Sequence, residues 1–173
     1  MNVYGLRSKS MNLSQELVKH LFDYADGQLI WKNPRVPSRA KVGARAGTFS
    51  NTTGYRQVSV NSVTVMEHRV IFLWHYGHLP ENVDHINHVR EDNRIENLRA
   101  ATVNENRYNA LSKSNNKSGV RGVHWAPKSK KWCACVRANN CIVFRCLIDN
   151  LELAELAVTE ARALYHGKFA CHA

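Results

Sequence analysis

The side chains that are capable of acid–base chemistry or metal binding are densest in one stretch of the sequence, Val83-Asp-His-Ile-Asn-His-Val-Arg-Glu-Asp-Asn-Arg-Ile-Glu-Asn-Leu-Arg99. Asp84 and His85 pair a hard oxygen ligand with a base that is neutral near pH 7. Asn97 lies twelve residues after His85, and Asn106 lies nine residues further on. This order of an acid, a base and two amides predicts a catalytic site that binds a hard cation.

A helix should follow this stretch. Thr102-Val-Asn-Glu105 has the spacing of a capping box, in which side chain and backbone of the first turn satisfy each other. Asn106 would lie just inside that helix, where its side chain can be presented toward Asp84. The expected layout is strand, loop, strand and helix. The structural alternative is a packed histidine among asparagine-rich turns, and Asn109 is a rival of Asn106 as the second metal ligand.

These residues resemble the HNH endonuclease family and its ββα-metal fold, and most of all the phage- and intron-encoded homing endonucleases. The resemblance extends over His68-Arg-Val-Ile71, Asp84-His-Ile-Asn87 and Asp92-Asn-Arg-Ile-Glu-Asn-Leu-Arg99. The cysteine pairs that hold a structural zinc in some members do not flank these segments.

The resemblance implies a metal-dependent DNA endonuclease. His85 would be the general base that deprotonates a water, and Asp84 and Asn106 would hold one divalent ion, Mg²⁺ or Mn²⁺. Asn97 would hydrogen-bond across the loop and fix how His85 is aimed. His68, His88 and Asn93 are nearby alternatives for these roles, and for each of them we expect a structural or phosphate-contacting role instead.

The last third of the chain predicts a second module. Strand-like runs near 120–125, 131–138 and 141–147 precede an amphipathic helix over 150–165 that should stop at Gly167. With Ser118-Gly-Val-Arg-Gly-Val-His-Trp125 and His166-Gly-Lys-Phe-Ala170, this region resembles the Apetala-type (ethylene-response-factor-like) DNA-binding domain. That family has a three-stranded antiparallel sheet packed on one helix.

This second resemblance implies that the sheet lies in the DNA major groove. The side chains carried over to the DNA face are Arg121, Trp125, Trp132, Arg137 and Arg145. For the two tryptophans, packing is an equally good interpretation. Arg145-Cys-Leu-Ile148 departs from the family's pattern, which leaves base-level specificity open.

Charge supports a polyanionic partner. The 173 residues include 24 Lys and Arg against 14 Asp and Glu, a formal net charge of +10, and nucleic acid is the first candidate. No acid lies between Asp26 and Glu67, or between Glu105 and Asp149. Within the first of these stretches we expect further DNA contacts from Lys32, Arg35, Arg39 and Lys41.

The expected fold class is α+β. Residues 1–54 would form an N-terminal helix, over 13–24, and a basic segment. The HNH core would cover 55–111, with a hairpin of strands 55–60 and 63–66 about Asn61-Ser62 and a helix over 68–76. A linker over 112–117 would lead to the DNA-binding module at 118–173.

Composition narrows the remaining classes of function. No apolar run approaches the roughly 18 residues of a membrane span, and the first residues have no apolar segment of a secretory signal. The five cysteines, an odd number, all lie after Lys131 and favour buried thiols in a reduced cytoplasm, that of the host if a phage encodes the chain. Double-stranded DNA is the expected partner, bound by a monomer or a homodimer. The alternatives are a non-catalytic regulator of transcription and an RNA-binding protein.

Overall fold

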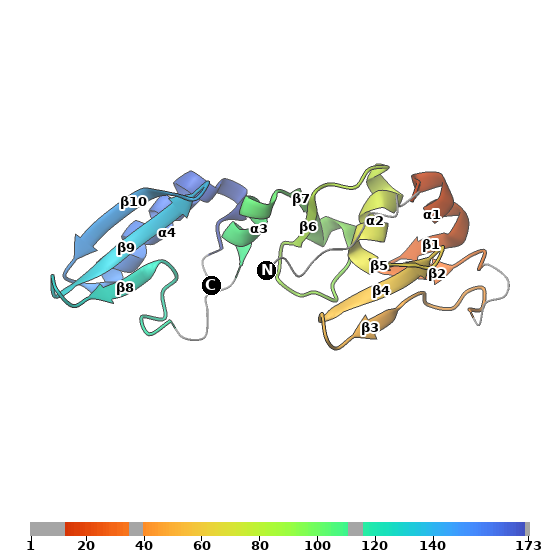
Figure 1. Ribbon diagram of the computed structural model, residues 1–173, viewed down its shortest axis with the longest axis horizontal. Coiled ribbons are helices and arrows are strands. Elements are labelled where there is room, and N and C mark those ends of the chain that lie inside the picture. Colours follow the sequence, from red (N-terminus) through yellow and green to blue (C-terminus); the bar gives the residue numbers. More distant parts are fainter. Residues whose placement is uncertain (1–12, 35–39, 111–115, 172–173) are drawn as a thin grey trace. The chain divides into compact units, whose positions relative to one another are not determined.

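The computed structural model describes residues 13–34, 40–110 and 116–171 (Figure 1). The chain divides into two compact units, Met1–Ala100 and Ala101–Ala173. Both combine helices with small sheets, as the predicted α+β class requires. Arg35, Arg39 and most of the predicted linker lie outside the described residues.

The first unit is built on hairpins. Its elements are α1 (Gln15–Leu21), β1 (Phe22–Ala25), β2 (Gln28–Trp31), β3 (Thr48–Ser50), β4 (Tyr55–Val60), β5 (Val63–Met66), α2 (Glu67–Tyr76), β6 (Asn82–His85), the short 3₁₀ helix η1 (Ile95–Asn97) and β7 (Leu98–Ala101), which ends at the boundary between the units. Strands β1 and β2 form one sheet, β3, β4 and β5 a second, and β6 and β7 a third.

Local sequence explains these elements. The Ser14 hydroxyl caps α1 by accepting a hydrogen bond from the Leu17 amide at 3.1 Å. Asn61 and Ser62, both with positive φ, make the two-residue turn of the predicted β4–β5 hairpin. The predicted helix before Gly77 is confirmed as α2, and Gly77 ends it in the left-handed conformation at φ 76°.

One apolar core joins the amino-terminal segment to the predicted nuclease region. Side chains from α1, β2, β4 and α2 are all buried in it, among them Val18, Leu29, Val58 and Ile71. Residues before position 55 are therefore part of the scaffold that supports β6, and not only a basic extension.

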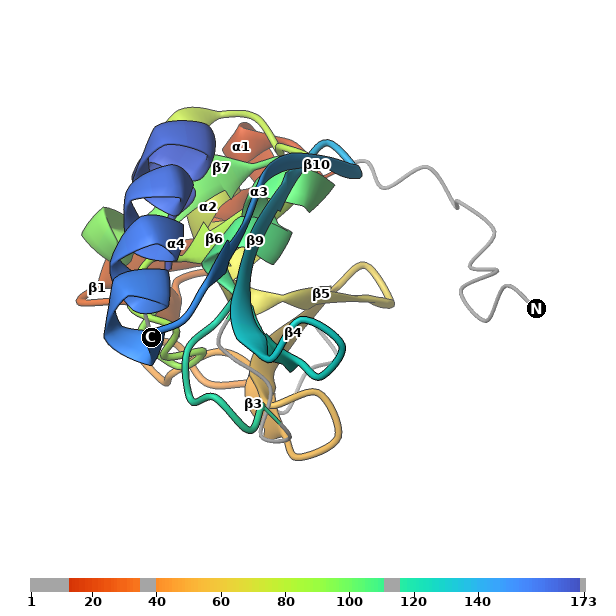
Figure 2. The same ribbon diagram turned by 90° about the vertical axis from the view of Figure 1, so that its left-hand side faces the viewer.

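The second unit holds α3 (Val103–Asn109), β8 (Val123–Ala126), β9 (Lys131–Ala138), β10 (Cys141–Ile148), α4 (Leu151–His166) and the 3₁₀ turn η2 (Gly167–Phe169). The three strands form one antiparallel sheet in the order β10–β9–β8. Helix α4 covers one face of this sheet, where Val123, Ala134 and Val136 pack against Ala154 and Val158 (Figures 1 and 2).

The caps of both helices in the second unit follow the sequence. The capping box predicted for Thr102 and Glu105 is confirmed at the start of α3. At α4, Asn150 is the N-cap and accepts from the amides of Glu152 and Leu153, and Gly167 ends the helix. The predicted three strands followed by a helix are confirmed as well.

Two further expectations concern the whole chain. None of the helices in the described ranges has both the length and the apolarity that a bilayer crossing requires. All five cysteines are free thiols, but the expectation that they are buried holds only for Cys133 and Cys171, since Cys135 and Cys146 are half-buried and Cys141 is exposed. Within the described ranges, no three or more His, Cys, Asp and Glu side chains gather into a metal-holding group.

Candidate active site

Strand β6 brings two of the predicted residues to the interior of the first unit. Asp84 and His85 are its last residues, and each side chain is 6% exposed. The strand pairs with β7, and the loop between them returns beside β6, where the Ile86 amide donates to the Asn97 carbonyl at 3.0 Å. Both side chains are therefore held on a strand end and not on a free loop.

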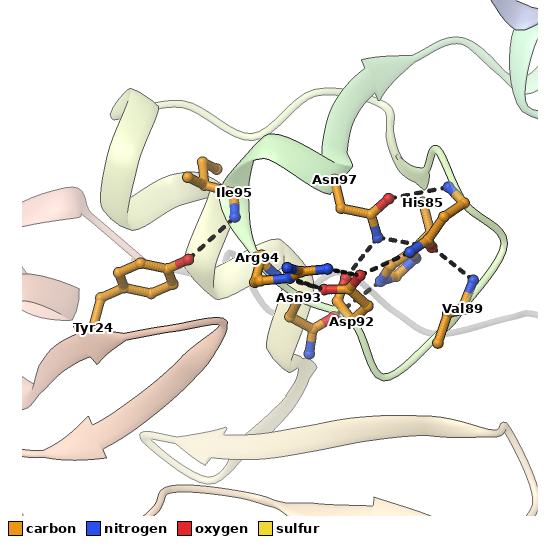
Figure 3. A network of polar contacts seen from close by, with 9 residues as sticks. Tyr24, His85, Val89, Asp92, Asn93, Arg94, Ile95 and Asn97 are labelled. Atoms are coloured by element: carbon orange, nitrogen blue, oxygen red, sulfur yellow. Dashed lines mark hydrogen bonds and ion pairs between the residues drawn. The ribbon is translucent and has the colours of Figure 1, made fainter.

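A chain of hydrogen bonds orients the imidazole of His85. Its Nε2 lies 2.9 Å from Asn93 Oδ1 (Figure 3). Asn93 Nδ2 in turn donates to Glu67 Oε2 at 3.1 Å. A carboxylate only accepts, so it fixes the orientation of the Asn93 amide, and the amide oxygen must accept from His85. The ring therefore carries its proton on Nε2 and its lone pair on Nδ1.

Glu67 anchors this chain from the first turn of α2. Its side chain is fully buried, and Oε1 accepts from the Leu29 amide at 3.3 Å. Arg56 Nε lies 3.3 Å and Arg45 Nη2 lies 3.8 Å from Oε2. Burial raises the pKa of Glu67, while the Leu29 amide, the two arginines and Asn93 act in the opposite direction.

The environment of His85 favours the neutral ring. Burial lowers its pKa, and this effect outweighs the bond to Asn93 and the nearby Asp84. The ring of His68, from α2, meets it edge to face with centroids 4.9 Å apart, and Tyr55 lies 5.9 Å away. A neutral histidine with a fixed tautomer can accept a proton, which is the property that a general base needs.

Asn97 closes the loop between β6 and η1. Its Oδ1 accepts from the Asn87 amide at 3.0 Å, and its Nδ2 donates to Asn87 Oδ1 at 2.9 Å and to the Asp92 carbonyl at 2.8 Å (Figure 3). It thus bonds across the loop, as the sequence predicted, while the direct partner of His85 is Asn93. A positioning role of Asn97 in catalysis stays a prediction.

The β1–β2 hairpin braces the same loop from outside. The Tyr24 hydroxyl accepts from the Ile95 amide at 3.1 Å (Figure 3). At Gly27, with φ 77°, a Cβ atom would lie 2.8 Å from the Arg94 nitrogen, so only glycine allows the turn to come this close. The loop that carries Asn93 is therefore held from both sides.

Asp84 carries a cationic partner. Arg99, on β7, donates from Nε and Nη2 to Asp84 Oδ2, both at 2.8 Å. Asp84 is a buried carboxylate, the donor type that commonly holds Mg²⁺ together with the substrate phosphate. A metal ion at this residue would have to compete with Arg99. The second predicted ligand, Asn106, is exposed on α3 of the second unit, whereas its rival Asn109 is buried there. Their approach to Asp84 stays a prediction.

The residues predicted to contact DNA from the sheet divide between its two faces. Residues directly opposite each other in a ladder share a face. Trp125 pairs with Trp132 on the face that α4 covers, where their rings are 5.2 Å apart. Arg145 pairs with Cys135 and therefore lies, with Arg137, on the opposite face, and both arginines are exposed. A single DNA face that contains all four does not agree with this register.

Arg121 has partners inside its own unit. Its guanidinium donates to the carbonyls of Arg107, Tyr108 and Ala110, at the C-terminal end of α3. Lys32 is ion-paired with Asp23 at 3.2 Å on the surface, and Lys41 is exposed. DNA contact by these residues stays a prediction, and Arg121 has in addition a structural role.

Sequence reasoning missed Glu67 as a part of the site and left Asn93 among the alternatives. Both are fully buried polar residues, a state that in proteins requires partners. A glutamate at the start of a helix looks like an ordinary first-turn acid, so nothing in its local pattern separates it from one. The role of Arg99 could not be predicted either, because its ion pair with Asp84 depends on how β6 and β7 are aligned.

Comparison with protein families gives a match that covers the segment around His85. Neither curated proteins nor solved structures give a significant match. Residues 65–108, which contain Glu67, His85, Asn93 and Asn97, match the family model described as HNH endonuclease.

Proposed function

We propose that this protein is a metal-dependent DNA endonuclease of the HNH homing type, with His85 as its general base. The observation that carries the proposal is the polar chain from His85 through Asn93 to Glu67, because it holds a neutral imidazole in one tautomer. A purely DNA-binding protein has no need of a buried histidine oriented in this way.

The reaction is the hydrolysis of a phosphodiester. A water gives its proton to Nδ1 of His85 as its oxygen bonds to phosphorus, and the bond from phosphorus to the 3′ oxygen breaks. The 3′ oxygen leaves with the bonding electron pair and takes a proton from solvent water, so the products are a 5′-phosphate and a 3′-hydroxyl. The Nε2 proton stays on the bond to Asn93, and Glu67 stabilises the imidazolium that forms.

Asp84 and Asn106 are the residues proposed to hold the divalent ion, Mg²⁺ or Mn²⁺. When bound, the ion would supply positive charge to the scissile phosphate and to the leaving oxygen. Asp84 supplies a buried carboxylate, a donor type that binds hard cations, and the ion would compete with Arg99 for Oδ2. We propose an Apetala-type arrangement for the second unit. Its exposed arginines would increase DNA affinity through contacts with backbone phosphates.

The test is cleavage of supercoiled plasmid and of long genomic DNA by the full chain, with Mg²⁺, Mn²⁺ or EDTA. We expect metal-dependent conversion to open-circular or linear plasmid, its loss in His85→Ala, and its retention in His78→Ala, an exposed histidine of the same unit. Conversion that survives EDTA, or a His85→Ala variant that cuts at the wild-type rate, would overturn the assignment. DNA binding without any cutting would favour the regulatory alternative.

A further inference from the structure

The second unit contains a basic cavity that the proposed nuclease chemistry does not use. Its volume is about 590 Å³, and its walls come from α3, β8, β9 and α4. Among the lining residues are four arginines and two histidines, and none is acidic: Arg107, Arg121, Arg137, Arg162, His124 and His166. The composition favours an anionic occupant.

Arg162, in the penultimate turn of α4, is the cavity residue for which an anionic partner would bring the largest stabilisation. Its side chain is 4% exposed, and its Nε and Nη2 atoms are buried without any hydrogen-bond partner. Arg121 in the same cavity differs, since three backbone carbonyls accept from its guanidinium. A buried guanidinium with two unpartnered nitrogens is unfavourable, so a negatively charged group that accepts from Nε and Nη2 would stabilise the folded unit.

The electrostatic environment points the same way. Burial lowers the pKa of Arg162 most, and the positive charge of Arg121 lowers it further. Cys171 is the nearby group with the opposite influence, but a thiol is a weak acceptor and does not replace an oxyanion. An anion between the two arginines would reverse their repulsion.

His166, at the end of α4, adds an acceptor. Its Nε2 donates to the Arg137 carbonyl at 2.9 Å, so the lone pair is on Nδ1, which is buried and has no partner. Tyr108 stacks on this ring at 4.0 Å and holds its plane. Among the described residues, the cavity therefore combines several hydrogen-bond donors without a partner, on Arg162, with one acceptor without a partner, His166 Nδ1.

We propose that this cavity is a binding site for a phosphate group in a monoester or in inorganic phosphate. A tetrahedral oxyanion can accept from the fork of N–H groups on Arg162, and a phosphate that keeps one proton can donate to His166 Nδ1. A phosphodiester has no such proton and satisfies only the arginine. Arg162 and His166 lie outside the matched HNH segment, whereas Arg107 and Tyr108 at its end contribute to the cavity wall. Phosphate binding here goes beyond the proposed cleavage.

The test is titration of the full chain with sodium phosphate against sodium chloride at equal ionic strength, followed by thermal unfolding and calorimetry. We expect a saturable rise of Tm with phosphate alone. Arg162→Met keeps the length of the side chain and removes the donors, so phosphate affinity should fall at least about tenfold. Lys128→Met, which removes one positive charge from the exposed β8–β9 turn, should keep the wild-type rise.

Equal effects of phosphate and chloride, or an undiminished rise in Arg162→Met, would overturn the proposal. If Arg162→Met does not fold, the ¹⁵N–¹H resonance of Arg162 Nε in the wild-type chain gives an independent readout. Phosphate should shift this resonance with the same saturation curve, and an unmoved resonance at saturating phosphate would equally exclude the site.

Two sources of the phosphate can be separated with short DNA duplexes. A duplex with 5′-phosphate ends should displace inorganic phosphate at lower concentration than the 5′-hydroxyl duplex if the ligand is a DNA end. Equal competition by both duplexes, with retained binding of inorganic phosphate, assigns the site to a small free phosphate compound. Neither readout involves DNA cutting, so failure of the nuclease proposal leaves this one testable.

Discussion

At the scale of single residues, the site depends on an amide between a base and an acid. Asn93 both donates and accepts, so it can accept from His85 while it donates to Glu67. A direct contact between His85 and the buried carboxylate would instead favour the charged imidazolium. The amide transmits orientation, while burial lowers the pKa of His85 and favours the neutral ring, which suits a base that must take up a proton.

Asn93→Leu tests this arrangement. The apolar side chain removes the acceptor for Nε2, so His85 should populate both tautomers and the cleavage rate should fall about 10²-fold or more. Stability should fall by about 1–3 kcal/mol, because Glu67 loses a buried donor. The measurements are the single-turnover cleavage rate, the DNA dissociation constant and the ¹⁵N shifts of the His85 ring.

A merely structural role of Asn93 would give a different result. In that case the variant would lose stability and the His85 ring would keep its Nε2 proton. A variant that cuts at the wild-type rate with an unchanged tautomer would contradict the positioning role. DNA affinity should stay within a few-fold of wild type in either case.

His68 should make stability depend on pH. Burial, followed by the neighbouring His85 and Arg69, lowers the pKa of His68 from 6.5 to about 3, so the unfolded chain binds a proton there between these values and the folded chain does not. The free energy of unfolding should therefore fall as pH falls below 6.5, by up to about 1.4 kcal/mol per pH unit from this residue.

His68→Phe provides the comparison. Phenylalanine keeps an aromatic ring beside Tyr55, whose centroid lies 5.2 Å from that of His68, and it cannot titrate. Urea unfolding at several pH values from 7.5 to 5 should give a shallower acid dependence in this variant. An unchanged slope would show that other groups cause the acid sensitivity.

At the scale of elements, the β1–β2 hairpin is a buttress for the active-site loop. Gly27→Ala should both strain the turn and push against Arg94, since its Cβ would lie 2.8 Å from the Arg94 nitrogen. Gly43→Ala is a matched control, because Gly43 has φ 79° and no atom within 4 Å of its Cβ position. Both variants should lose about 1 kcal/mol of stability from the positive φ.

Only Gly27→Ala should also lower the cleavage rate, because the displaced loop carries Asn93. The measurements are urea unfolding and single-turnover cleavage for both variants. Equal rates in the two variants would mean that the hairpin supports the fold alone and has no influence on the site.

The elements themselves were readable from sequence where a local signal is strong. Asn61-Ser62 predicted a hairpin, Gly77 the end of α2, and Thr102 with Glu105 the start of α3, because turns and caps are local chemistry. The pairing of Asp84 with Arg99 and of His85 with Asn93 was not readable, because it depends on how β6, β7 and their loop meet. The division of Trp125 and Arg145 between two faces likewise needs the strand register.

At the scale of the whole molecule, the proposed general base and the proposed DNA-contacting arginines of the sheet lie in separate compact units. The oriented histidine lies in the first unit, and the exposed arginines of the sheet lie in the second. Arg137 and Arg145 are exposed on the face of the sheet opposite α4, where we propose that DNA binds. If this assignment holds, loss of the base and loss of a surface cation should change different observables.

His85→Ala should leave DNA affinity within a few-fold of wild type and abolish cutting. Arg145→Met should weaken binding similarly for all sequences and reduce the slope of log affinity against log salt by about 1, because one phosphate contact fewer releases one counterion fewer. Lys19→Met, which removes a charge from α1, should leave that slope unchanged. The measurement is fluorescence anisotropy with a labelled duplex over a range of salt concentrations. An unchanged slope in Arg145→Met would mean that this face of the sheet does not contact the DNA backbone. A similar drop of the slope in Lys19→Met would mean that the net charge of the protein, and not a defined surface, binds the DNA.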